Sequence, residues 1–133
     1  ICKYFCDLHP SNKLLTESGS SERATHSQWT SFAQSEIEAY LWHNFQLDRA
    51  GQEGNSFATV KDLNIGIASS GLKVINSHLE SHEYFGGPLF TLTDIVVGWT
   101  LNWARRSELT EDFPAIEAYL AKLLSRPYCS LAK

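Results

Sequence analysis

The chain has 133 residues, of which 43% are hydrophobic and 12% are aromatic, and this composition suits one globular domain with a sizeable core. The net charge is −4 at pH 7, and the longest cluster of basic residues is Arg105-Arg106, so neither nucleic acid nor an anionic membrane surface is expected as a partner. No apolar run approaches the ~20 residues of a membrane-spanning helix. We therefore expect a cytoplasmic protein whose three cysteines are reduced.

The first part of the chain is expected to be a short helix followed by a linker. Apolar residues recur at helical spacing over residues 1–8, and Pro10 ends the run. Residues 11–21 are rich in Ser, Asn, Thr and Gly and are typical of a connecting loop. We place a domain boundary there, between a segment at 1–21 and a main domain at 22–133. Because the chain begins at Ile1 and contains no methionine, we expect it to be a fragment of a longer protein.

The main domain is expected to open with a helix of about 25 residues that begins near Ser21, because its apolar residues recur at three-and-four spacing. The opposite face carries Ser35, Glu38 and Trp42. Two interpretations stay open for that face: a solvated surface with one exposed ring, or one wall of a ligand cleft. A second long helix over about 57–79 is apolar on two sides, so we expect neighbours on both.

The next helix has the clearest start in the sequence. Thr91 is an acceptable N-cap, and the carboxylate of Asp94 can reach back to its backbone N–H, which is the pattern of a capping box. Phe90 and Ile95 are placed to close a hydrophobic staple around this cap. This function explains Asp94 without any substrate, so we interpret the carboxylate as structural rather than catalytic.

The capped helix is predicted to run to about Arg106 and to be buried at the centre of the domain, because it is apolar around most of its circumference. Gly98 costs roughly 1 kcal/mol relative to Ala in a helix, so we expect another helix to cross closely there. A further amphipathic helix should begin at Pro114 and end at Arg126-Pro127, and residues 129–133 are expected to begin another. No strand pattern is present, so the fold class is all-α, a helical bundle.

Several motifs together resemble one protein family. The hexapeptide over residues 90–95, F-T-L-T-D-I, is similar to the F-T-L-A-D-I motif that opens the central helix of the all-helical domain in glutathione transferases. Residues 22–32 look like the start of the first long helix of that domain, and residues 113–116 and 126–127 resemble its last helices. The resemblance covers roughly residues 22–133. Residues 1–10 are similar to the last helix of the thioredoxin-like domain that precedes it, so they are expected to be its remnant.

The resemblance implies that the parent is a glutathione transferase. This part alone is expected to be inactive, because the missing thioredoxin-like domain would hold the cosubstrate glutathione and activate its thiol. The expected partners are that domain, a hydrophobic electrophilic small molecule, and a second copy of the parent in a homodimer. The positions of this chain that match the family's electrophile pocket are Ser35, Glu38, Trp42, Asn102, Trp103 and Arg106. For Trp103 a place in the core is the alternative.

Other functions stay open. Similar helical domains occur in translation factors and synthetase complexes, where they assemble partners, so a non-catalytic interaction module is the alternative to an enzyme domain. A helical domain unrelated to the family is a third possibility. No metal is expected, because the histidines show no ligand spacing beyond His78 and His82, which are better suited to act as cations at a helix end.

Overall fold

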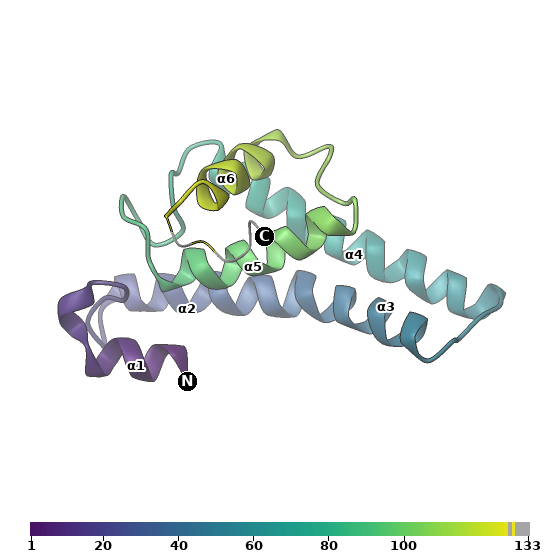
Figure 1. The fold of residues 1–133 in the computed structure, drawn as a ribbon, viewed down its shortest axis with the longest axis horizontal. Coiled ribbons are helices and arrows are strands. Elements are labelled where there is room, and N and C mark those ends of the chain that lie inside the picture. Colours follow the sequence, from purple (N-terminus) through teal and green to yellow (C-terminus); the bar gives the residue numbers. More distant parts are fainter. Residues whose placement is uncertain (128, 130–133) are drawn as a thin grey trace.

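The computed structural model describes residues 1–127 and Cys129, and within them all regular structure is helical (Figure 1). No strand is present in this part, although Tyr84 and Gly87 form an isolated bridge, so the all-α prediction is confirmed. None of the helices in these residues is long and apolar enough to cross a bilayer. The helix predicted at 129–133 lies outside the described residues, apart from Cys129. The elements are α1 (Cys2–Leu8), η1 (Pro10–Asn12), α2 (Ser21–Ala33), η2 (Gln34–Glu38), α3 (Ala39–Arg49), α4 (Asn55–Leu79), α5 (Leu92–Arg106) and α6 (Pro114–Leu124).

The predicted long helix is continuous from α2 to α3 but contains a π-helical turn, η2. It begins at Ser20, whose hydroxyl accepts from the backbone N–H of Arg23 at 3.1 Å. A π turn carries more residues per turn than an α-helix, so it rotates the face that follows it. The spacing of apolar residues alone does not predict this turn, since the residues before and after it both show helical spacing.

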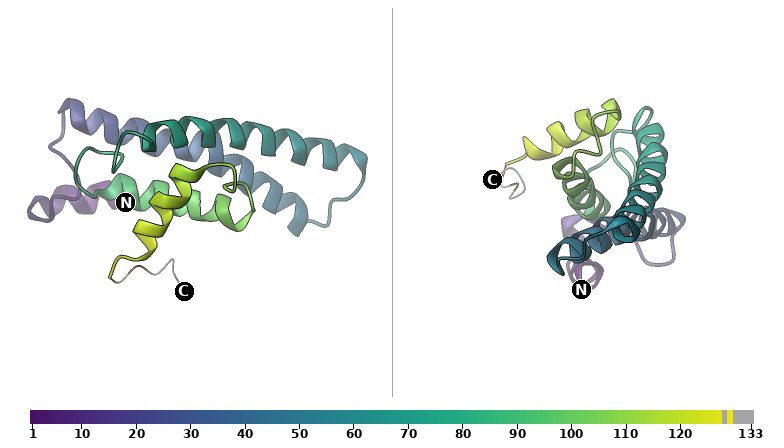
Figure 2. Two further views of the ribbon diagram at one scale, coloured as in Figure 1. Left: turned by 90° about the horizontal axis from the view of Figure 1, so that it is seen from above. Right: turned by 90° about the vertical axis from the view of Figure 1, so that its right-hand side faces the viewer.

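The helices form two layers around one core. α3 and α4 run along the length of the molecule in opposite directions, joined by the loop at residues 50–54 (Figure 1). α5 packs against α2 and η2, while α6 packs against α4 and crosses α5 (Figure 2). The core contains buried residues from each of these elements except α1 and η1, among them Ala33, Ile37, Leu41, Ala68, Leu72, Ile75, Val97, Leu101, Ile116 and Leu120.

Helix α5 is held in place at its start and at its middle. At the start, the Asp94 carboxylate accepts from the Thr91 N–H at 2.8 Å, which is the predicted reach of the capping box. At the middle, a Cβ on Gly98 would lie 2.6 Å from Leu123 Cδ1 of α6, which confirms the predicted close crossing. Ile95 is 46% exposed, and the predicted staple between it and Phe90 stays a prediction.

The segment at 1–21 is attached to the helical domain by polar contacts. Asp7 and Arg23 form an ion pair at 2.7 Å, and Lys3 donates to the Ser27 hydroxyl at 3.0 Å. The carbonyl of Leu14 accepts from the backbone N–H of Leu92 at 2.8 Å, so the linker is fixed to the first turn of α5. These contacts tie α1 to α2 and the linker to α5, whereas the domain boundary near residue 21 stays a prediction.

Candidate functional site

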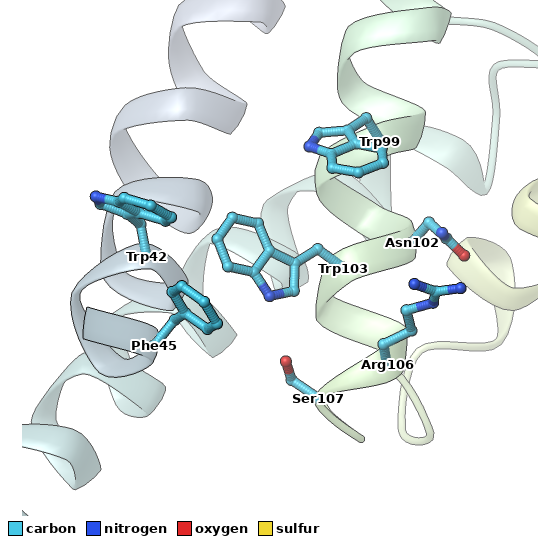
Figure 3. A pocket seen from close by; sticks show the side chains of 7 residues that line it. All are labelled: Trp42, Phe45, Trp99, Asn102, Trp103, Arg106 and Ser107. Atoms are coloured by element: carbon cyan, nitrogen blue, oxygen red, sulfur yellow. The ribbon is translucent and has the colours of Figure 1, made fainter. Parts of the chain in front are cut away.

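A pocket of about 390 Å³ opens between α3 and the exposed face of α5 (Figure 3). Helices α3 and α5 supply six of the seven lining residues, and the seventh, Ser107, directly follows the end of α5. The lining residues are Trp42, Phe45, Trp99, Asn102, Trp103, Arg106 and Ser107.

Aromatic rings form the apolar side of the pocket. The ring of Trp42 stacks on Phe45 with centroids 5.4 Å apart, and the ring of Trp103 meets both edge-on, at 6.2 and 6.4 Å. Such edge-to-face pairs stabilise one another beyond the area that they bury. In Figure 3, Trp103 projects from α5 toward Trp42 and Phe45 on α3, and Trp99 lies one turn earlier on α5. The rings therefore make a wall suited to a flat apolar ligand.

The rings of this wall are only partly covered by protein. Trp42 is 47% exposed, Phe45 46% and Trp99 51%. Trp103 is half-buried and packs against the core as well as lining the pocket. The two interpretations of Trp103, core residue and pocket residue, therefore both describe part of its surroundings.

Polar groups line the other side of the pocket. Asn102 and Arg106 lie together on the flank of α5 away from the rings of α3 (Figure 3). The carbonyl oxygen of Asn102 accepts from the guanidinium of Arg105 at 3.0 Å. Ser107 adds a hydroxyl just past the helix end. The pocket can thus offer hydrogen-bond donors to one end of a ligand whose apolar part contacts the rings.

The structure brings together four of the six residues predicted to bind substrate, namely Trp42, Asn102, Trp103 and Arg106. Ser35 and Glu38 are not among the lining residues. The Ser35 hydroxyl donates to the carboxylate of Glu36 at 3.0 Å, whereas the carboxylate of Glu38 accepts from the buried Thr100 hydroxyl at 2.8 Å. Glu38 therefore links the π turn to α5, and a substrate contact for either residue stays a prediction.

Sequence reasoning missed three lining residues, Phe45, Trp99 and Ser107. A signal existed for Trp99, because it precedes Trp103 by four residues and therefore lies on the same stripe of α5. Phe45 fits the apolar stripe of its helix, and the sequence does not reveal that its ring is 46% exposed.

The titratable groups near the start of α5 have structural partners. The hydroxyl of Tyr119 donates to Asp94 at 2.8 Å, and burial together with this carboxylate raises the pKa of Tyr119 well above its usual value. Burial lowers the pKa of His26 and of His78, so both rings favour the neutral form. For His78 this disfavours the predicted cation at the helix end. The residues with a description contain no cluster of three or more His, Cys, Asp or Glu side chains that could hold a metal.

The chain is similar in sequence or fold to known proteins of two kinds, glutathione transferases and elongation factor 1-gamma. Residues 58–122 match the family of the glutathione S-transferase C-terminal domain. A glutathione transferase from Methylococcus capsulatus is 25% identical, with a TM-score of 0.79 over 94% of this chain and 59% of its own. A glutathione transferase family member from Pseudomonas fluorescens, solved with two glutathione bound, is 27% identical, with a TM-score of 0.76 over 93% of this chain and 56% of its own.

Among curated proteins, a probable elongation factor 1-gamma from Arabidopsis thaliana is 31% identical over 96% of this chain. The chain spans 31% of the length of that protein. The match of the family model, together with the helical fold and its order of elements, agrees with the resemblance found in the sequence. The chain therefore carries a C-terminal helical domain of the glutathione transferase type.

Proposed function

We propose that this chain is the electrophile-binding domain of a glutathione transferase, and that the pocket between α3 and α5 binds a hydrophobic electrophile. The observation that carries the proposal is the wall formed by Trp42, Phe45, Trp99 and Trp103, with donors at its other side. Aromatic surface binds an apolar ligand by buried area, while a few polar groups orient it. Both elements of that arrangement are supplied by side chains of this chain.

The remaining chemistry is assigned to the whole protein. Glutathione would be held by a thioredoxin-like domain ahead of the helical one, whose last helix is represented by α1, with the boundary near residue 21. The glutathione bound to the relative from Pseudomonas fluorescens supports this choice of cosubstrate. The thiolate sulfur would attack the electrophilic carbon, form the C–S bond and release the leaving group, or it would reduce a peroxide or a disulfide while glutathione is oxidised to a disulfide. A cytoplasmic homodimer is the expected form of the whole protein, and this chain alone should have no catalytic activity.

Ligand binding can be tested on this chain, because three of its four tryptophans line the pocket. We expect 1-chloro-2,4-dinitrobenzene to quench their fluorescence saturably and to bind with a measurable heat by titration calorimetry. Trp103→Leu should weaken binding by about tenfold or more, since it removes the ring that faces both Trp42 and Phe45. Trp29→Phe is the matched control, because Trp29 packs against His78 and Phe85 instead. Equal weakening by both variants would contradict the proposal.

A second candidate function is an assembly module without catalysis. It is favoured by one observation, the 31% identity to a probable elongation factor 1-gamma over almost the whole chain. The two candidates differ in what the full-length protein does with glutathione and 1-chloro-2,4-dinitrobenzene. An enzyme accelerates the addition of the thiolate over the uncatalysed rate, and loses most of that rate with Trp103→Leu. An assembly module leaves the rate unchanged.

A further inference from the structure

We infer that a second site, the linker groove, docks an acidic segment of a partner protein in which carboxylates flank a bulky apolar side chain. The groove has a volume of about 500 Å³ and lies where the linker, the bend before α5 and the end of α6 meet. None of its described lining residues belongs to the pocket between α3 and α5, so the inference does not depend on the function proposed for that pocket. The lining residues that carry it are Lys13, Glu83, Tyr84, Leu89, Phe90 and Arg126.

The walls of the linker groove are fixed to one another by hydrogen bonds. The backbone N–H of Leu92 donates to the carbonyl of Leu14 at 2.8 Å, which ties the linker to α5. The ammonium group of Lys122 on α6 donates to the carbonyl of Glu83 at 2.8 Å, which ties the bend to α6. The groove is therefore formed before a partner arrives, and less conformational freedom is lost when one docks.

Two aromatic rings line the groove, and each of them is covered by a cation. Tyr84 and Phe90 meet edge-on with their centroids 6.0 Å apart. The ammonium of Lys122 lies 4.0 Å from the centroid of Tyr84, and the guanidinium carbon of Arg126 lies 3.6 Å from the centroid of Phe90. At this distance no N–H of Arg126 has room to point into the ring, so the guanidinium lies flat on it. Its N–H donors stay in the guanidinium plane, where a carboxylate can accept two parallel N–H···O bonds.

The charge that stays unpaired in the groove is positive. Glu83 is the one acidic residue among the described lining residues, and its carboxylate lies 3.5 Å from the ammonium of Lys122. Within the part of the chain that the structure describes, neither Lys13 nor Arg126 has an ion-pair partner. This local excess contrasts with the net charge of −4 for the chain. The groove therefore complements the charge of an acidic partner.

The exposure of the groove favours a segment of protein over a small molecule. Leu89 is 64% exposed, and Lys13, Pro88 and Arg126 are exposed as well. Small-molecule sites bury about 70–90% of the surface of their ligand, which requires walls that enclose it. An open groove that presents arginine, aromatic rings and a bulky apolar side chain instead has the composition of a protein interface. The docked segment places its apolar side chain against Leu89 and its carboxylates on Arg126 and Lys13.

Two peptides of the same length and shape test the inference. Ac-DELFDE-NH2 carries carboxylates on both sides of its apolar pair, and Ac-NQLFNQ-NH2 replaces each of them by the isosteric amide. We expect the acidic peptide to bind this chain about tenfold more tightly at low salt, because charge-assisted hydrogen bonds are lost with the amides. High salt should remove most of this preference, since exposed charges are screened. Titration calorimetry with each peptide measures the two dissociation constants.

Substitutions locate the binding site. Arg126→Gln and Lys13→Gln should each reduce the preference for the acidic peptide to about threefold or less, whereas Arg126→Lys should keep more of it because it keeps the charge. The matched control is Lys73→Gln, which removes the same charge from the exposed surface of α4, outside the groove, and should keep the full preference. Leu89→Ala should weaken both peptides, and Trp103→Leu, in the other pocket, should weaken neither. Circular dichroism confirms that each variant is folded.

Three results would overturn the inference. The first is equal affinity of the wild-type chain for both peptides. The second is a loss of preference in Lys73→Gln as large as that in Arg126→Gln, since net charge would then be responsible. The third is full competition by millimolar inorganic phosphate at constant ionic strength, which would mean that the groove takes a small anion. Sedimentation tests the remaining occupant, because a dimer of this chain that Arg126→Gln dissociates would place a second copy in the groove and would likewise overturn the inference.

Discussion

Asp94 is the residue on which the largest number of buried polar contacts depends. Its carboxylate accepts from the N–H of Phe85 at 3.0 Å, the N–H of Thr91 at 2.8 Å, the hydroxyl of Thr91 at 2.9 Å and the hydroxyl of Tyr119 at 2.8 Å. Asp94 is completely buried. The carboxylate therefore joins the bend before α5, the first turn of α5, and α6, and its role is wider than a helix cap.

Asp94→Ala is expected to lower the free energy of unfolding by at least about 3 kcal/mol, because it removes the cap and leaves several buried donors unsatisfied. A lost cap alone would cost only about 1 kcal/mol. Urea unfolding followed by circular dichroism measures the difference.

Tyr119→Phe is the matched control for this change, because it removes one of the donors and keeps the acceptor. We expect it to cost about 1 kcal/mol. If Asp94→Ala costs no more than Tyr119→Phe, the carboxylate is not the centre of the network. A folded Asp94→Ala protein that keeps its stability but no longer binds 1-chloro-2,4-dinitrobenzene would instead make Asp94 a ligand contact.

At the scale of elements, the close approach of α4 to the π turn depends on one glycine. A Cβ on Gly71 would lie 2.8 Å from Cγ1 of Ile37 and 3.1 Å from the backbone oxygen of Glu36. A flexible side chain can move aside from such a contact, but a backbone oxygen cannot move without shifting its helix. Gly66, five residues earlier on the same helix, has no atom within 4 Å of the corresponding position.

The two glycines of α4 should respond to the same substitution with opposite signs. Gly66→Ala is expected to raise the free energy of unfolding by about 0.5–1 kcal/mol, since Ala restricts the unfolded chain and favours helix. Gly71→Ala gains the same intrinsic preference but should lower stability by about 1–3 kcal/mol through overpacking against η2. Thermal unfolding of both variants decides the matter. A stabilising Gly71→Ala would show that α4 and the π turn can separate without cost.

At the scale of the whole molecule, the sequence predicts the features that depend on residues close together along the chain. The start of α5 can be predicted because Thr91 and Asp94 are three residues apart, and the crossing at Gly98 because a glycine is costly inside a helix. The contact of Tyr119 with Asp94 joins residues 25 positions apart, and no periodic pattern in the sequence predicts it. The same holds for the π turn, whose partner is α4. In the pocket, Asn102, Trp103 and Arg106 of α5 were predicted from the family resemblance, whereas the contact of Trp103 with the rings of α3 depends on the tertiary fold.

Two histidines, the buried His26 and the half-buried His78, link the stability of the whole domain to pH. His26 is fully buried, its Nδ1 lies 2.7 Å from the Thr93 hydroxyl, and its Nε2 has no partner within the described part of the chain. Burial lowers the pKa of His26, with Arg23 and Lys3 acting in the same direction and Asp94 opposing them. Burial and the neighbouring His82 likewise lower the pKa of His78. A hydrogen bond with the backbone of Tyr84 and the charge of Asp94 act in the opposite direction. In both cases the unfolded chain binds a proton more readily than the folded one.

Because the folded pKa values lie below the unfolded value of about 6.5, these rings contribute full stability above that pH and lose it as the pH falls through the folded values. We therefore expect the urea concentration at the unfolding midpoint to decrease as the pH is lowered from 7.5 to 5. His26→Gln should reduce this slope, since glutamine cannot gain the proton, while His9→Gln, at an exposed position, should leave it unchanged. A midpoint that is constant or rises on acidification would mean that the folded protein protonates these rings without cost. A fall that is smaller in His26→Gln than in wild type would show that the contact between α2 and the start of α5 favours a neutral ring at position 26.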